Sequence, residues 1–174
     1  MADSSDVKGF YNKFSDEVLL EDFRRVNLRQ EAIKELCDRY VPSGGRVLEI
    51  GCGVGIIAGH LRHVVGGYLG VDISERNVEI AREYVQDSRF EFKVLDVIEQ
   101  SSELGFYGLF DVVILPDVIE HIPKDRYEDL FAVIEQHLEE PGVVLFTFPS
   151  PEYHDYLKAN DPSALQVVDE TVED

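Results

Sequence analysis

The chain has 174 residues, of which 44% are hydrophobic, so we expect one domain with one sizeable core. Its formal net charge of −19 argues against a nucleic-acid substrate and against anionic membranes, because both require a positive face. The two cysteines are too few for a disulfide framework and lack metal-ligand spacing, and no motif suggests a metal. No stretch is apolar enough to span a bilayer, and the N-terminus lacks signal-peptide organisation, so a cytoplasmic protein is predicted.

The first 41 residues are predicted to form a separate helical segment. The triplet Ser15-Asp16-Glu17 is typical of a helix start and follows three clustered aromatic residues, Phe10, Tyr11 and Phe14. Two apolar stripes at helical spacing come next, at Val18, Leu19, Phe23 and Val26, and at Ala32, Ile33, Leu36, Cys37 and Tyr40. The sequence of residues 42–45, PSGG, ends this segment.

A strand, a glycine turn and a helix start follow one another from residue 46 to residue 61. Val47, Leu48 and Ile50 are typical of a buried strand, and glycines at alternate positions, Gly51, Gly53 and Gly55, come directly after it. Because glycine lets the backbone approach a ligand closely, the turn favours nucleotide binding. A dinucleotide fingerprint would need another glycine at Ile56, so that type of site fits poorly. A turn with only a packing role is the alternative.

Two further strands each end in an acidic residue. Residues 68–72 form the first, and its terminal Asp72 lies about twenty positions beyond the glycine turn, where a carboxylate can accept both hydroxyls of a ribose. A helix cap is the competing interpretation, although Ser74 already suits that task ahead of a helix over 75–86. Residues 90–95 form the second strand, and Asp96 follows it.

The most apolar of the later strands, residues 110–115, should lie beside the first strand at the centre of the sheet. It leads into residues 116–123, at the carboxyl end of the strand, where ligands bind in open α/β sheets. An amphipathic helix over 124–138, a strand over 143–148 and a short helix over 152–158 complete the pattern. Strands that alternate with helices predict an α/β fold with a parallel sheet.

Four of these stretches resemble motifs of the class I S-adenosylmethionine-dependent methyltransferases of the small-molecule type. They are VLEIGCGVG at 47–55, GVDIS at 70–74, Asp96 with Val97 after the strand over 90–95, and FDVVILPDVIEHIP at 110–123, in the order of that family. The resemblance implies a Rossmann-like three-layer sandwich with strand order 3-2-1-4-5. It divides the chain into a lid over 1–41, a cofactor-binding core over 42–158 and an acidic tail over 159–174. The antiparallel hairpin that usually ends the family's sheet is expected to be missing, because only residues 165–168 then resemble a strand.

The resemblance also implies a cofactor, S-adenosyl-L-methionine, with S-adenosyl-L-homocysteine as its product. Asp96 would take the adenine amino group and the backbone of Val97 a ring nitrogen, and an arginine among Arg24, Arg25 and Arg29 could hold the methionine carboxylate. Tyr11 would line the methyl-donor pocket. The full set of cofactor-binding residues is then Tyr11, Glu49, Gly51, Gly53, Gly55, Asp72, Ile73, Asp96, Val97 and Leu115.

The predicted reaction transfers a methyl group to an oxygen or nitrogen atom of a small molecule. Because histidine exchanges a proton near neutral pH, His121 is the candidate base or substrate-orienting residue, and packing within its loop is the alternative. Two other functions stay open: a cofactor-binding module without activity, and a nicotinamide-dependent oxidoreductase. The apolar fifth strand would form an exposed sheet edge, which soluble proteins normally cover. The acidic tail could fold over it, a second copy could pair with it, or the chain could be a shortened form of a longer protein. A shortened chain that forms a homodimer through this edge is the favoured interpretation.

Overall fold

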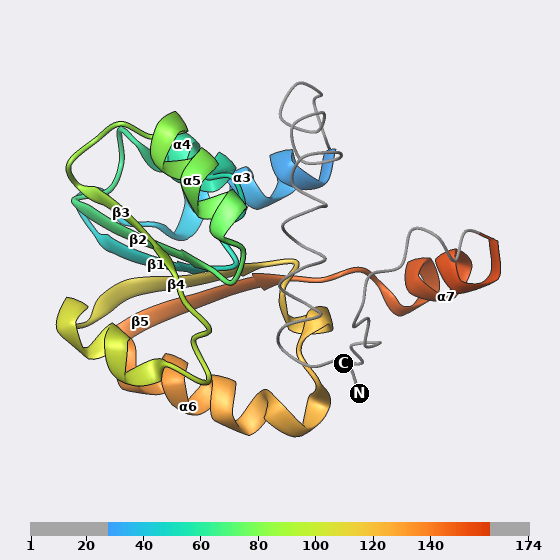
Figure 1. The fold of residues 1–174 in the computed structure, drawn as a ribbon. Helices are drawn as coiled ribbons and strands as arrows, with labels where there is room; N and C mark the ends of the chain where they lie inside the picture. The colour runs from blue at the N-terminus through green and yellow to red at the C-terminus, as the bar shows by residue number, and fades with distance from the viewer. Residues whose placement is uncertain (1–27, 161–174) are drawn as a thin grey trace.

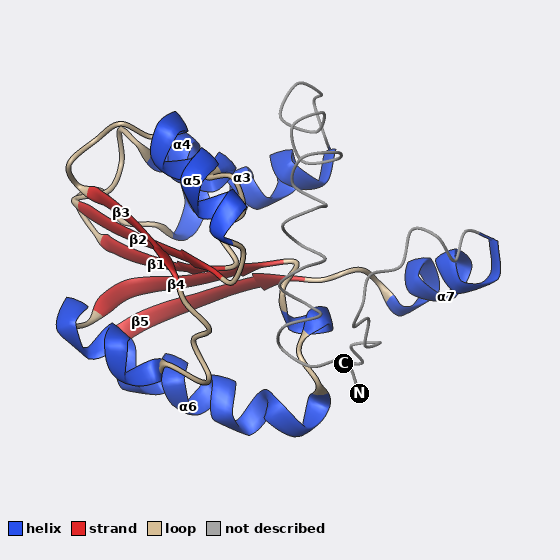
Figure 2. Ribbon diagram, in the orientation of Figure 1, coloured by secondary structure: helices blue, strands red, loops and turns tan. Residues whose placement is uncertain are grey.

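The computed structural model describes residues 28–160, which form three layers around one sheet (Figures 1 and 2). The sheet has five strands, all parallel, in the order β3-β2-β1-β4-β5. This confirms the predicted α/β class and strand order. The strands are β1 (Arg46–Ile50), β2 (Gly67–Asp72), β3 (Phe90–Val94), β4 (Phe110–Pro116) and β5 (Leu138–Thr147).

Helices cover both faces of the sheet (Figure 2). One face carries α3 (Leu28–Tyr40), α4 (Ile56–Leu61) and α5 (Glu75–Tyr84). The other carries α6 (Tyr127–His137) and the short 3₁₀ segment η2 (Ser101–Tyr107). The helix α7 (Pro151–Asn160) projects away from the sheet (Figure 1). None of the helices between residues 28 and 160 has the length and hydrophobicity of a membrane span.

Alternate residues of β1, β2, β4 and β5 build two apolar clusters, one on each face of the sheet. Val47 of β1 packs toward α3, α4 and α5, whereas its neighbour Leu48 packs toward α6. Both side chains are fully buried, as are Val112 and Val113 of β4. This two-residue period explains why the central strands read as continuous apolar runs in the sequence: parallel strands are buried on both faces.

The predicted helix over 124–138 was wrong at both ends. Residues Lys124–Arg126 form a separate 3₁₀ turn, η4, and Leu138 already belongs to β5, where it pairs with Phe110. The register of β4 with β5 shifts between Phe110 and Val112, and Pro141 and Gly142 lie within that irregularity. A bulge accommodates the proline because proline has no N–H to donate to a neighbouring strand.

The two outer strands of the sheet differ at their free edges. On β3, Nε and Nη2 of Arg82 both donate to the carbonyl of Phe92, at 3.1 and 2.6 Å, so a side chain of α5 caps this edge. On β5, the apolar residues Val143, Val144 and Leu145 are only half-buried, and Phe146 is 44% exposed. The prediction of an apolar fifth strand at the edge of the sheet therefore holds for the described residues.

Candidate functional site

The segments that follow the strands meet at one edge of the sheet, because parallel strands share the position of their carboxyl ends. The backbone N–H groups of Gly51 and Cys52 both donate to the carbonyl of Val71, at 2.8 and 3.0 Å. The N–H of Leu95 donates to the carbonyl of Asp72 at 2.9 Å. The glycine turn after β1, the end of β2 and the start of the loop after β3 are thus joined by backbone hydrogen bonds.

The glycine turn leaves open space at its centre. Gly53 has a φ of 51°, and a Cβ added there would meet no atom of residues 28–160 within 4 Å. At Gly51, with a φ of 76°, a Cβ would instead overlap Cγ2 of Val118, which belongs to the segment after β4. The turn therefore abuts the 116–123 segment on one side and can admit a ligand close to its backbone at Gly53.

Asp72 lies at the carboxyl end of β2 and is 8% exposed. Its Oδ2 accepts a hydrogen bond from the N–H of Gly53 at 2.9 Å, and its Oδ1 accepts one from the N–H of Ser74 at 2.8 Å. Burial raises the pKa of this carboxyl, and the hydrogen bonds from Ser74, Gly53 and Asn77 oppose that rise. The structure thus joins two residues that the sequence predicted to bind the cofactor, Gly53 and Asp72, by a direct contact.

Asn77 is a residue of the site that sequence reasoning missed. It lies in the first turn of α5, is 2% exposed, and its Nδ2 donates to Oδ1 of Asp72 at 3.2 Å. Ser74 caps this helix as predicted, since its Oγ accepts from the N–H of Asn77 at 3.2 Å. The available signal was an amide side chain three residues after the capping serine, on the face of α5 that packs against the sheet.

Asp96 follows β3 and organises its own loop. Its Oδ1 accepts from the N–H groups of Ile98 and Glu99, at 3.1 and 3.2 Å, and its carbonyl accepts from Gln100 at 2.8 Å. Val97 is buried, whereas Ile73, beside Asp72, is half-buried. Asp96 and Val97, which are predicted to bind the adenine, therefore lie in a local turn beyond the carboxyl end of β3, and Asp72 lies at the carboxyl end of the neighbouring strand β2.

Glu49 lies inside the molecule. It is 1% exposed, and its Oε2 accepts a hydrogen bond from the hydroxyl of Tyr68, on the neighbouring strand β2. Burial raises the pKa of Glu49 to about 8, although the Tyr68 hydroxyl lowers it in part. The side chain of Leu115 is also buried, in the cluster that packs against α6.

His121 ends a short 3₁₀ segment, η3 (Ile119–His121), beyond β4. Its side chain is 14% exposed, and its Nε2 lies 4.0 Å from Oε1 of Glu120, which is buried. Asp117 is the first residue after β4 and has a positive φ of 57°. At the end of β5, Oγ1 of Thr147 donates to Oδ1 of Asp117 at 2.7 Å. The histidine thus sits on a loop that is held at its start and partly open to solvent.

A family model described as "Methyltransferase domain" matches residues 23–167 of the chain. The chain belongs to this methyltransferase family. The predicted membership of the class I S-adenosylmethionine-dependent methyltransferases is confirmed. The motifs that resemble this class lie in four parts of the structure: the glycine turn, the end of β2, the loop after β3 and the segment after β4.

Curated relatives of this methyltransferase carry the name ubiquinone biosynthesis O-methyltransferase. The mitochondrial protein of Mus musculus is 26% identical over 162 residues, which cover 83% of this chain and 42% of that protein. The protein of Bordetella avium is 33% identical over 98 residues, which cover 55% of this chain and 39% of that protein. The methyltransferase chain thus spans about two fifths of the length of these relatives.

Solved structures share its fold. A complex of the Haloferax volcanii Trm112 methyltransferase activator with a methyltransferase aligns with a TM-score of 0.74 and 19% identity, over 95% of this chain and 69% of that chain. The DhpI–SAH complex aligns with a TM-score of 0.67 and 19% identity, over 90% of this chain and 86% of that chain. At these identities the likeness establishes the architecture alone.

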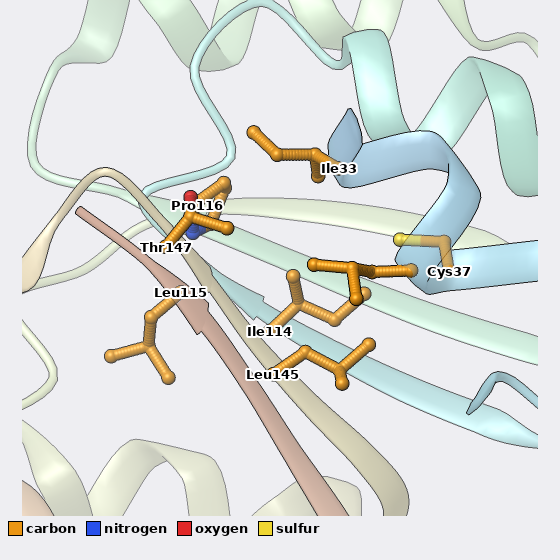
Figure 3. Close-up of a pocket in the computed structure, with 8 residues that line it drawn as sticks. Ile33, Cys37, Ile114, Leu115, Pro116, Leu145 and Thr147 are labelled. Carbon is orange, nitrogen blue, oxygen red and sulfur yellow. The ribbon is translucent and has the colours of Figure 1, made fainter. Parts of the chain in front are cut away.

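One small cavity of the methyltransferase lies between α3 and the strands β4 and β5 (Figure 3). Ile33 and Cys37 of α3 approach Ile114 of β4 and Leu145 of β5 there, and the surface that lines the cavity is apolar. Its volume of about 10 Å³ has room for roughly one water. Burial raises the pKa of the Cys37 thiol to about 12, so this thiol is a packing group.

Several of the predicted site residues, and most of two predicted segments, lie outside residues 28–160. Tyr11, Arg24 and Arg25 precede residue 28, as does most of the proposed lid, and the acidic tail lies almost wholly beyond residue 160. Arg29 belongs to α3. The side chains of Ile33 and Cys37, further along this helix, are buried in the core. Between residues 28 and 160, no group of three or more histidine, cysteine, aspartate or glutamate side chains could hold a metal ion.

Proposed function

We propose that this chain binds S-adenosyl-L-methionine and transfers its methyl group to an oxygen or nitrogen atom of a small molecule. The contact between Gly53 and Asp72 carries the proposal, because it joins a turn open to a ligand to a buried carboxylate that can accept a ribose hydroxyl. Membership of the methyltransferase family supports it. An oxygen acceptor is favoured, since the curated relatives are named O-methyltransferases.

Different residues would hold different parts of the cofactor. Asp72 accepts from the ribose, the backbone of the glycine turn passes beneath the methionine portion, and Asp96 with Val97 faces the adenine. Ile73, Leu115 and Tyr11 are proposed to complete the set, with Tyr11 as the residue that would line the methyl-donor pocket. Glu49 is proposed to act through the strand that leads into the glycine turn, because its carboxyl is buried and accepts a hydrogen bond from Tyr68 of β2.

Bound S-adenosylmethionine supplies an electrophilic methyl group on a sulfonium, so the protein mainly has to align an acceptor with it. Gly53 fits such a cofactor because its missing side chain leaves space for close approach. His121 is proposed to orient the acceptor and to take the proton from its hydroxyl or amine as the new bond forms. Its side chain lies beyond β4 and is 14% exposed, which is consistent with contact to an acceptor.

Isothermal titration with S-adenosylhomocysteine and with nicotinamide dinucleotides is the first test. Binding of S-adenosylhomocysteine alone supports the proposal, and preference for a nicotinamide dinucleotide would favour an oxidoreductase instead. Turnover is then tested with a set of catechols, phenols and amines, followed by mass spectrometry for a gain of one methyl group. Binding without methylation of any acceptor would support a cofactor-binding module.

Residues 1–41 are proposed to form a lid over the cofactor, with α3 as its fixed end. Nε2 of His60 on α4 lies 2.6 Å from Oδ1 of Asp38 on α3, and Cys37 is fully buried, so α3 is fastened to the core. Removal of residues 1–27 should then weaken S-adenosylhomocysteine binding while leaving the unfolding of residues 28–160 cooperative. Unchanged affinity in the shortened chain would contradict the lid.

We also propose a homodimer that forms through β5. The half-buried valines of this strand and the 44% exposure of Phe146 support it, because soluble proteins normally cover an apolar strand edge. Light scattering should give twice the mass of the chain, and Phe146→Lys should restore the monomer. A monomeric wild-type chain would contradict this arrangement.

The net charge of −19 supports the further expectation that nucleic acids and anionic membranes are not partners.

A cytoplasmic location is proposed as well. The two described cysteines, Cys37 and Cys52, are both buried and free, as is usual in reducing compartments. Cell fractionation or a fluorescent fusion can test this. Recovery with mitochondria, the location in the name of the Mus musculus relative, would overturn it.

A further inference from the structure

The segment that carries His121 has little rigidity of its own. It leaves β4 through Asp117, whose φ of 57° lies in the left-handed region, which residues with a side chain adopt rarely, although aspartate does so more readily than most. It then forms the single 3₁₀ turn η3. One such turn has weak hydrogen-bond geometry and adds little rigidity by itself, so contacts from outside the segment have to fix it.

The first of these contacts lies at the start of the segment. The N–H of Asp117 donates to the carbonyl of Thr147 at 3.0 Å, and Oγ1 of Thr147 donates back to Oδ1 of Asp117 at 2.7 Å. Thr147 is the last residue of β5 and is in register with Pro116 of β4, so the sheet holds the threonine in place. The residue with the positive φ is thus bonded twice to one residue of the neighbouring strand.

The second contact comes from Tyr127, the first residue of α6. Its hydroxyl donates to the backbone carbonyl of Ile119, within η3, at 3.1 Å. The ring of Tyr127 packs edge to face against Phe131, with 6.4 Å between the ring centroids, and Leu130 of the same helix is fully buried in the core. Tyr127 therefore ties the 3₁₀ turn to a helix that the core holds in place.

The rotation of η3 decides which of its side chains is open to solvent. Successive residues of a 3₁₀ helix point about 120° apart, since three residues make one turn. Ile119 and Glu120 are buried, whereas the side chain of His121 is 14% exposed. A rotation of the turn would therefore change the direction in which the imidazole points.

We propose that the hydroxyls of Tyr127 and Thr147 form a two-point clamp that holds η3 and keeps His121 directed at the acceptor. Both are positioning residues, because the clamp requires neither of them to touch the acceptor or the cofactor. The inference rests on the proposed function of His121. It adds the two side chains, one from α6 and one from β5, that set the direction of the histidine.

Amide hydrogen exchange of the ligand-free chain, followed by NMR, tests the clamp without any acceptor. The backbone N–H groups of His121 and Ile122 both donate to carbonyls within the segment, at 2.9 and 3.2 Å. Both should exchange about tenfold faster in Tyr127→Phe and in Thr147→Val, because each change removes a hydroxyl and nearly keeps the shape of the side chain. The amide of Leu95, in another loop, should keep its rate. Unchanged exchange at His121 and Ile122 would overturn the clamp.

Turnover shows whether the clamp acts on catalysis. With the catechol, phenol or amine that wild type methylates fastest, Tyr127→Phe and Thr147→Val should each lower kcat about tenfold. The dissociation constant of S-adenosylhomocysteine should change by less than about twofold. Thr147→Ser keeps a hydroxyl and should retain most of the wild-type kcat. Tyr107→Phe, which removes a hydroxyl that donates to Glu91 at 3.0 Å, is the matched control and should leave kcat unchanged.

A double-mutant cycle separates this role from general support of the fold. In a His121→Ala background, Tyr127→Phe should change kcat by less than about twofold, because the group that the tyrosine positions is already absent. An equal loss of kcat with and without His121 would overturn the positioning role, and so would an equal loss of kcat and of cofactor affinity. A wild-type chain that methylates no member of the acceptor set would instead refute the proposed function, and the exchange measurement would still decide the clamp.

Discussion

The hydroxyl of Tyr68 donates a hydrogen bond to Oε2 of Glu49 between two central strands, so a carboxyl group and a phenol are paired inside the core. The pKa of Glu49 is raised to about 8 by burial, and that of Tyr68 is raised well above its usual value for the same reason. Both groups are therefore held in their neutral forms at pH 7. Neutral partners avoid the cost of a buried charge next to the glycine turn.

This pair gives the protein an unusual pH dependence. Between about pH 4.5 and pH 8 the folded state keeps a proton on Glu49 that the unfolded chain has lost, so the unfolding free energy should fall as the pH rises through that range. The slope should be at most about 1.4 kcal/mol per pH unit, and urea denaturation at several pH values measures it. Glu49→Gln should remove this contribution.

Tyr68→Phe is the complementary change. The hydroxyl lowers the pKa of Glu49, so its loss should raise that pKa further and extend the fall in stability to higher pH. If wild type, Glu49→Gln and Tyr68→Phe all show the same dependence on pH, Glu49 is ionised in the folded protein and the assignment is wrong.

Cofactor affinity should depend on Asp72. Asp72→Ala removes the acceptor for the ribose and leaves the N–H groups of Gly53 and Ser74 without their partner, so S-adenosylhomocysteine should bind roughly tenfold more weakly or worse. Asp129→Ala, on the exposed surface of α6, is the matched control and should bind as wild type does. Equal affinity of a folded Asp72→Ala protein and wild type would refute ribose binding at this residue.

His121 should affect turnover more than cofactor binding. His121→Ala is expected to lower kcat by about a hundredfold or more with any acceptor, because proton transfer by a positioned side chain contributes about that much. The dissociation constant of S-adenosylhomocysteine should change by less than about threefold. His63→Ala, at an exposed position, provides the control. Normal kcat together with weaker cofactor binding would assign His121 to the cofactor site instead.

The proximity of Val118 to Gly51 should couple the glycine turn to the 116–123 segment. Gly51→Ala places a Cβ at a φ of 76° and against Cγ2 of Val118, so it should destabilise the protein by about 2 kcal/mol or more. In the double variant with Val118→Ala, part of this loss should be recovered because the overlap is relieved. Urea denaturation of the four proteins gives the coupling energy, and strictly additive effects would show that the two segments are independent.

Much of this arrangement could be predicted from the chain itself. The apolar runs of β1 and β4 and the glycines between residues 51 and 55 identified the centre of the sheet, and parallel strands then required Asp72 and Asp96 to lie at one edge. Tyr68 and Asn77 were missed because their roles depend on partners across strands, which local periodicity does not reveal. The start of β5 was missed because Leu138 completes the apolar face of α6, and only its pairing with Phe110 assigns it to the sheet.

The two hydrogen bonds from Arg82 to the carbonyl of Phe92 make the two outer strands of the sheet unequal. At β3, any strand that joined the sheet would first have to displace a guanidinium that donates twice to the outer carbonyl. At β5, the outer face offers half-buried valines and the exposed ring of Phe146. Within residues 28–160, a further strand would therefore be impeded at β3, because it must break two hydrogen bonds, whereas at β5 it would meet apolar residues that are partly exposed.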